Sequence, residues 1–460
     1  MRHFKPVLTT LLIILMALPV IAGRRQIKKG VNPMLTSARI ALFSSPPRYD
    51  EAMAYFDTVL IDYGPIPEAY FYKGNIYAEY ASREYEFAGK IEKFELMSAH
   101  YDSLYYACES DDVKKKYKDK CDEFTRIVDS IKVFYWSENY NNGVKIIDRI
   151  DKELNPNLHS AADSAAEEAA RAALYATADS GKGYFGIAIA VNSKDQRSLE
   201  GLGLLYDRLR MSDSALVWFE RAYEIDSTRI SIVQSIAYAY INMQKWAKSI
   251  QYLKKVHELE PGDAVTLENI AICFNNLQMP DSAFAYNKKA IKVDTTSAGA
   301  FIDVGQYYLV SSTKYRDSAN YFKRENNNAE ADRYIALENE LLDSATVYFG
   351  KGVELDPDDV FARERYAIVL MVKGKYEEAA EQFKKLTEMS PNIKDYWINH
   401  GDCLLQMQEF EEAMVPYEKG LELDSTDIKL MEVLLDIYNS QQLTEKAEAL
   451  SAKLEELRGQ

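Results

Sequence analysis

The sequence predicts an all-α fold, a right-handed α–α superhelical solenoid made of repeated helix pairs. Three observations predict it. The 460 residues are too many for one compact core. The stretch "DSALVWFERAYEIDSTR" at 213–229 returns in altered form as "DSAFAYNKKAIKVDTTS" at 281–297. The chain holds 33 Tyr against 20 Gly and 13 Pro, fewer turn residues than strand architectures usually need.

The N-terminal residues 1–23 are predicted to be a signal peptide or an N-terminal membrane anchor. The run 6–23 carries no charge, follows two cations and ends in small residues, as secretory signals do. It is short for a membrane span. Four cations then follow in the basic linker 24–34, and positive charge at that place hinders translocation. Cleavage and an uncleaved anchor therefore both stay open. Membrane association through residues 6–29 is the matching expectation, and a solvated tail is the simpler alternative.

The recurring stretches lie 68 residues apart, twice 34, and a third copy, "KWAKSIQYLKKVHELEPGD", stands between them at 245–263. Thirty-four residues is the period of a helix-turn-helix unit with the pattern W-x2-L-G-x2-Y, then A-x3-F, then P. Residues 199–219 place these side chains on that pattern: Leu199, Leu202, Gly203, Tyr206, Ala215 and Phe219. Residues 366–391 and 397–417 repeat it. The chain therefore resembles the tetratricopeptide-repeat family.

The register of this pattern divides the chain into segments. We expect N-terminal repeat-like helices at 35–86, divergent or inserted long helices at 87–143, a degenerate repeat at 144–195, three regular repeats at 196–297, irregular repeat-like helices at 298–359, and C-terminal repeats with a capping helix at 360–460. The "DSA" marks at 281, 317 and 343 are unevenly spaced. Residues 310–345 are therefore predicted to contain longer or shortened elements.

The pattern also predicts how the helices pack and begin. Small residues recur at one position of each first helix, where two helix axes are expected to approach closely: Gly203, Ala237, Ala271, Gly305, Ala367 and Gly401. Asp213 and Asp281 are expected to cap the second helices. Asp226, Asp294 and Asp424 stand where the family usually has Pro, and are expected to end one helix and begin the next.

Few motifs indicate chemistry. Gly181, Gly183 and Gly186 match G-x-G-x-x-G, but an Ala-rich helix precedes them where a dinucleotide site needs a strand. The histidines show no metal-ligand spacing, so neither a metal nor a cofactor is predicted. No small-molecule substrate is implied. The chain is predicted not to be an enzyme, and a site hidden in residues 87–143 is the alternative.

The cysteines form two groups. Cys108 and Cys121 are 13 positions apart on neighbouring predicted helices, and an extracytoplasmic location would permit a disulfide between them. Cys273 and Cys403 occupy the same repeat position and are interpreted as small core residues.

The family resemblance implies a concave groove lined by the first helices. Carried over to the cleaner repeats, its lining consists of Glu200, Leu204, Asp207, Gln234, Tyr238, Asn242, Glu268, Ile272, Asn275, Glu364, Ile368 and Met371. This set lacks the paired Lys and Asn with which some members of the family hold a chaperone's terminal carboxylate. An extended peptide or a partner helix is expected instead, and a merely solvated face is the alternative.

The predicted function is therefore a non-enzymatic scaffold that binds a partner protein or peptide. The net charge of −16 argues against nucleic acid as the partner. The signal-like N-terminus, the many tyrosines and the "DSA" marks resemble envelope repeat proteins of Gram-negative bacteria. A periplasmic or envelope location is the expectation, and a membrane-tethered assembly factor anchored in the inner membrane is the alternative.

Overall fold

The computed structural model describes residues 33–159 and 164–458, and within these ranges every regular element is a helix and no strand occurs. The predicted signal or anchor at 1–23 and nearly all of the basic linker lie outside them. The chain forms two compact units, Met1–Gln244 and Lys245–Gln460. None of the helices in the described ranges combines the length and the apolar character that a membrane crossing requires.

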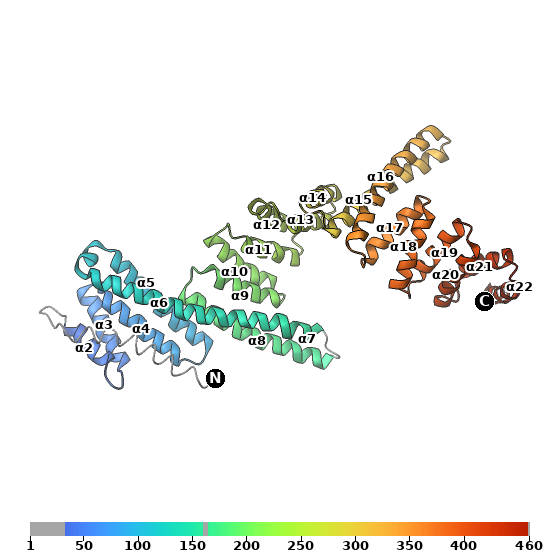
Figure 1. The fold of residues 1–460 in the computed structure, drawn as a ribbon. Helices are drawn as coiled ribbons and strands as arrows, with labels where there is room; N and C mark the ends of the chain where they lie inside the picture. The colour runs from blue at the N-terminus through green and yellow to red at the C-terminus, as the bar shows by residue number, and fades with distance from the viewer. Residues whose placement is uncertain (1–32, 160–163, 459–460) are drawn as a thin grey trace. The chain divides into compact units, whose positions relative to one another are not determined.

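The first unit contains α6, which with 39 residues is the longest helix in the described ranges (Figure 1). Its elements are α2 (Pro33–Leu42), α3 (Tyr49–Tyr63), α4 (Pro67–Arg83), α5 (Phe87–Glu109), α6 (Asp111–Arg149), the π-helix η1 (Ile150–Leu154), α7 (Asn155–His159), α8 (Ser164–Val191), α9 (Gln196–Arg208), α10 (Ser212–Ile225) and α11 (Ile230–Asn242). The closest pairs are α4 with α5, α6 with α8, and α9 with α10.

The second unit is built mainly of regular pairs. Its elements are α12 (Trp246–Leu259), α13 (Ala264–Asn276), α14 (Pro280–Val293), α15 (Ala298–Arg324), α16 (Asn328–Leu355), α17 (Val360–Val372), α18 (Tyr376–Met389), α19 (Lys394–Gln406), α20 (Phe410–Leu423), α21 (Ile428–Ser440) and α22 (Thr444–Arg458). Neighbouring helices along this sequence pack against one another. Both units are therefore all-α helical-repeat solenoids, as the sequence predicts.

Short polar side chains fix where the first helix of a pair begins. At Asp195, Asp263, Asp359 and Asp427 the carboxylate accepts a hydrogen bond from a backbone N–H of the first turn, and Ser297 does the same with its hydroxyl. Such a cap is worth about 0.5–2 kcal/mol. The capping residues lie 34 or 68 positions apart, except that Asp359 follows Ser297 by 62 positions, which is 34 plus the 28 residues added to α15 and α16. The caps therefore recur with the repeat.

The expected capping role of Asp213 and Asp281 is wrong. The residues that precede α10 and α14 are Met211 and Met279, which make no side-chain cap, and the two aspartates lie inside the first turn. There a negative charge still interacts favourably with the helix dipole. The turn before each second helix uses another device: a residue with positive φ, such as Arg210 (φ 57°), two positions before the helix begins.

Asp226, Asp294 and Asp424 end helices as expected. Each stands directly after a second helix and accepts hydrogen bonds from both the backbone N–H and the hydroxyl of the threonine two positions later. These bonds lower the pKa of Asp226 and Asp294, chiefly through the threonine hydroxyl. The turn is thus closed by a side chain where the family pattern has Pro.

The recurring small residues are buried, but the reason differs from the expected one. A Cβ atom on Gly203 would lie 2.4 Å from the ring of Phe219, and one on Gly401 would lie 2.7 Å from the ring of Tyr417. The space at this position is therefore filled by the aromatic side chain of the paired second helix. It is a small-to-large contact inside one pair rather than a close approach of two helix axes.

The glycines of the G-x-G-x-x-G match lie within α8, so the strand and loop of a dinucleotide site are not present at this position. A Cβ atom on Gly183 would lie 2.2 Å from the ring of Phe87 in α5, and one on Gly181 would lie 2.8 Å from Ile146. Gly181 and Gly183 are buried. These glycines allow α8 to pack tightly against its neighbours.

Two unusual links hold the N-terminal part of the first unit together. Glu68 of α4 is buried, with 2% of its side chain exposed, and forms ion pairs with Arg39 of α2 and Lys120 of α6. Cys108 and Cys121 form a disulfide between α5 and α6, with their Cα atoms 5.6 Å apart. Cys273 and Cys403 are free and buried, as the core interpretation predicts.

The irregular segment 310–345 contains lengthened helices and no shortened ones. α15 and α16 have 27 and 28 residues, whereas α13 and α14 have 13 and 14, so each is 14 residues longer. The "DSA" marks at Asp317 and Asp343 lie inside these helices and begin neither. α8 is lengthened in the same way: it has 28 residues against 14 in α10, and its additional part is 164–177.

Candidate partner-binding site

In the first unit, the predicted groove residues differ in accessibility. Tyr238 and Asn242 are exposed, and Leu204, Asp207 and Gln234 are half-buried. Asn242 donates a hydrogen bond to Asp207 at 3.2 Å, so the structure brings these two predicted residues together. A partner can therefore reach the end of α9 and the outer face of α11.

The three glutamates of the predicted groove are engaged within the protein. Glu200 is buried and forms an ion pair with Arg229 at 2.8 Å, at the start of α11. Glu268 accepts from the hydroxyl of Ser297 at 2.5 Å, at the start of α15. Glu364 accepts from the hydroxyl of Tyr396 in α19 at 3.2 Å. Each glutamate thus ties one first helix to the next first helix.

The remaining groove residues of the second unit present apolar and amide side chains that a partner could reach. Ile272 is 45% exposed and Asn275 is exposed, whereas Ile368 and Met371 are half-buried. The assignment of these residues to a groove stays a prediction.

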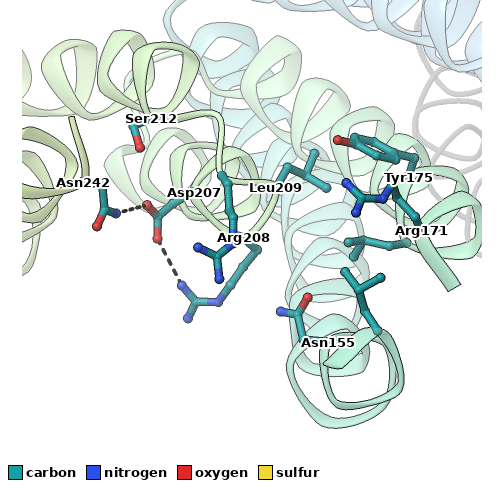
Figure 2. A pocket seen from close by; sticks show the side chains of 11 residues that line it. Asn155, Arg171, Tyr175, Asp207, Arg208, Leu209, Ser212 and Asn242 are labelled. Atoms are coloured by element: carbon teal, nitrogen blue, oxygen red, sulfur yellow. Dashed lines mark hydrogen bonds and ion pairs between the residues drawn. The ribbon is translucent and has the colours of Figure 1, made fainter. Parts of the chain in front are cut away.

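A cavity of about 450 Å³ adjoins Asp207 and Asn242 in the first unit (Figure 2). The added part of α8 supplies Arg171, Leu174 and Tyr175 to its lining. α7 supplies Asn155 and Leu158, the end of α9 and the following turn supply residues 207–212, and α11 supplies Asn242. The cavity exists because α8 is longer than a regular second helix and continues past the end of α9.

Positive charge dominates the lining of this cavity. Arg171, Arg208 and Arg210 contribute three guanidinium groups, against the one carboxylate of Asp207. In Figure 2, Arg171 and Arg208 enter from different helices, and Asn155 lies at the lower edge. This positive patch belongs to a chain whose net charge is −16. The cavity is therefore a local site of attraction for an anion on an acidic protein.

The three arginines differ in what they already bind. Arg208 donates to Asp151 at 2.6 Å and lies 3.4 Å from the carboxylate of Asp207. Arg171 pairs with Glu167, one turn earlier in α8, at 2.6 Å. Arg210 is exposed and forms no ion pair within the described part of the chain. Arg171 and Arg210 are thus the groups best able to bind a ligand.

Reasoning from the sequence did not single out these arginines. They come from different elements, and no spacing rule joins position 171 to positions 208 and 210. The sequence does show a cation, Arg171, within the Ala-rich stretch 164–177. Its place in the cavity, however, depends on α8 continuing past the end of α9.

A second cavity, of about 550 Å³, lies among α5, α8, α9 and α10. The two large aromatic rings in its lining already form cation–π contacts within the protein. Arg221 lies 4.7 Å from the centroid of the Trp218 ring, and Lys182 lies 5.4 Å from that of the Tyr206 ring. In the described ranges, no three His, Cys, Asp or Glu side chains gather as a metal site requires.

Comparison with known proteins identifies the repeat. Residues 365–428 match the model of the tetratricopeptide-repeat family. The STIP1 homolog of Dictyostelium discoideum is 29% identical over 101 residues, which cover 22% of this chain and 18% of that protein. Subunit 3 of the anaphase-promoting complex of the same organism is 24% identical over 98 residues, which cover 21% and 10%. The chain spans less than a fifth of the length of these relatives.

Solved structures with similar helices include two repeat proteins. A tetratricopeptide-repeat protein from Parabacteroides merdae is 16% identical, with 65% of this chain and 98% of that chain covered and a TM-score of 0.37. The C-terminal part of a repeat protein from Cytophaga hutchinsonii is 16% identical, with 57% and 97% covered and a TM-score of 0.42. The family match covers 365–428, and the same helix pair recurs at the 34-residue spacing in the regular parts of the described chain, so the chain contains tetratricopeptide repeats.

Proposed function

We propose that this protein is a non-enzymatic scaffold of the bacterial cell envelope that binds a partner protein or peptide. The observation that carries the proposal is the accessible surface at the end of α9 and on α11. There Tyr238 and Asn242 are exposed beside a cavity with three arginines. Tyrosine and arginine are among the residues that protein interfaces favour.

Two observations support the envelope location. The uncharged run 6–23 has the layout of a secretory signal. The disulfide between Cys108 and Cys121 is of a kind that persists in oxidising compartments and is rare in the cytosol. A membrane-tethered assembly factor differs from a soluble scaffold only in whether the N-terminal segment is retained.

A pull-down from native envelopes with the intact chain as bait tests this function. We expect a stoichiometric protein partner, and mass spectrometry of the bait's N-terminus separates the cleaved form from the tethered one. Tyr238→Glu together with Asn242→Lys should weaken capture about tenfold or more, with little change in melting temperature. Tyr321→Glu is the matched control, because Tyr321 is also an exposed tyrosine but lies on α15. Capture of no partner by the unaltered chain would overturn the proposal.

A further inference from the structure

We infer that the cavity beside α8 binds an internal acidic segment of the partner, through side-chain carboxylates that flank an aliphatic residue. The inference rests on the proposed function, since it names the part of the partner that this one site takes. The inference rests on Arg171 and Arg210. Of the three arginines that line the cavity, these two have the guanidinium groups best able to bind a ligand.

The first step is that the site is specific to this chain and not to the repeat. Arg171 and Tyr175 come from 164–177, the part of α8 that a regular second helix does not have. Asn155 and Leu158 come from α7, a short helix outside the regular pairing. The predicted groove positions contribute only Asp207 and Asn242.

The second step concerns charge. Arg208 already binds two carboxylates of the chain itself, those of Asp151 and Asp207, which shows the ligand type that this lining accepts. The pair between Arg171 and Glu167 joins side chains that are each at least half exposed. An exposed pair of this kind contributes little to stability, so a ligand carboxylate can replace Glu167 at little cost. At Arg210 the ligand has no ion pair within the described ranges to displace.

The third step concerns the shape of the ligand. Arg171 and Arg210 line the cavity from different elements, so two acidic side chains of one segment can each meet one guanidinium in the bidentate geometry that arginine favours. The half-buried Leu158 and the 43% exposed Tyr175 give the same cavity an apolar wall. An aliphatic side chain between the two acids fits there.

The test is fluorescence anisotropy at low ionic strength, with the intact oxidised protein and a labelled, C-terminally amidated peptide in which two glutamates flank a leucine. We expect saturable binding that weakens as salt is added. Arg171→Gln and Arg210→Gln should each weaken it about tenfold or more, because hydrogen bonds between charged groups are lost. Circular dichroism of both variants should match that of the unaltered protein.

Arg333→Gln is the matched control. Arg333 also lies on the added part of a lengthened helix, α16, is exposed, and pairs with a carboxylate of its own helix, Glu330. It should leave peptide binding unchanged. Equal weakening by Arg333→Gln would mean that only the overall charge matters, and would overturn the inference.

Three further outcomes would also overturn it. A peptide with glutamine in place of both glutamates could bind as tightly. Only a peptide with a free C-terminus could bind, which would assign the site to a terminal carboxylate. Inorganic phosphate could displace the peptide at equal concentration, which would indicate a general oxyanion site. If the peptide does not bind while the envelope pull-down still captures a partner, the inference about the cavity is wrong and the proposed scaffold function is retained. If the pull-down captures no partner, the proposed scaffold function is itself wrong.

Discussion

The regular pair α13–α14 and the lengthened pair α15–α16 follow one another in the second unit and use the same core in different ways. The lengthened pair buries Gly305 of α15 against the ring of Phe349 in α16. At the corresponding position of the regular pair, α14 has the buried Asn287, which donates a hydrogen bond to Asp303 of α15. In α15 and α16, 14 residues are added to each helix beyond that core. Fourteen residues is close to four helical turns, so the buried face keeps its direction.

The added part has weaker support than the core beneath it. Its contacts are half-exposed rings, such as Phe322 stacked on Tyr334 at 5.4 Å, and an ion pair between Arg316 and Glu338 at 2.6 Å. The buried residues of the repeat therefore determine the fold. The added parts can bring side chains that the regular repeat does not have, as the added part of α8 brings Arg171 to the cavity.

The largest expected effect comes from removing one addition without the other. Deletion of 311–324 alone leaves a 13-residue helix facing a 28-residue partner, so apolar residues of α16 lose their cover, and we expect the cooperative thermal transition of the second unit to be lost. Deletion of both 311–324 and 328–341 restores the lengths of a regular pair, with Asn326 at the positive-φ position. We expect that protein to unfold cooperatively in calorimetry. Cooperative unfolding of both deletion proteins would contradict the requirement for matched lengths.

The next effect compares an aromatic residue of the core with one of the addition. Phe349→Ala should lower the free energy of unfolding by about 3–5 kcal/mol, because Phe349 is fully buried and leaves a cavity. Tyr334→Ala should cost about 1–2 kcal/mol, since Tyr334 is half-buried and its neighbours can close in. Urea titration measures both. A larger loss from Tyr334→Ala would mean that the addition, and not the repeat core, stabilises this pair.

The long helices α5 and α6 of the first unit differ from α15 and α16 in having a covalent link. Cys121→Ser should cost about 2–3 kcal/mol, the range expected for a disulfide that closes a short loop. The cost should equal the effect of a reductant on the unaltered chain, measured by thermal unfolding. A reductant that lowers the melting temperature of Cys121→Ser as well would show that its effect does not act through this bond.

The smallest effect is on pH dependence. Burial, and then the charge of Lys73, lower the pKa of His100 in α5 to about 4, below its ordinary value of 6.5. The unfolded chain therefore binds the proton more readily, so stability falls as pH decreases from about 6.5 towards 4. Because His100 is partly exposed, we expect a loss of only about 1 kcal/mol. His100→Gln should remove this slope from urea midpoints measured across that interval. An unchanged slope would place the titrating group elsewhere.

The sequence by itself determined the regular pairs. The 34-residue spacing, the A-x3-F pattern and the small residues such as Gly203 and Gly401 encode which face of each helix is buried, and burial is a local, periodic property. The same pattern could not assign Glu200, Glu268 and Glu364 to ties between successive first helices, because each partner lies about 30 positions away.

Only the tertiary structure decided the length of α8 and the cavity beside it. The Ala-rich stretch favours a helix wherever it stands, and nothing local shows that its first turns line one cavity with the ends of α9 and α11. Arg171, Arg208 and Arg210 become one site only when three elements meet there. Sequence periodicity records what each helix buries, whereas a site between helix ends depends on where those helices stop.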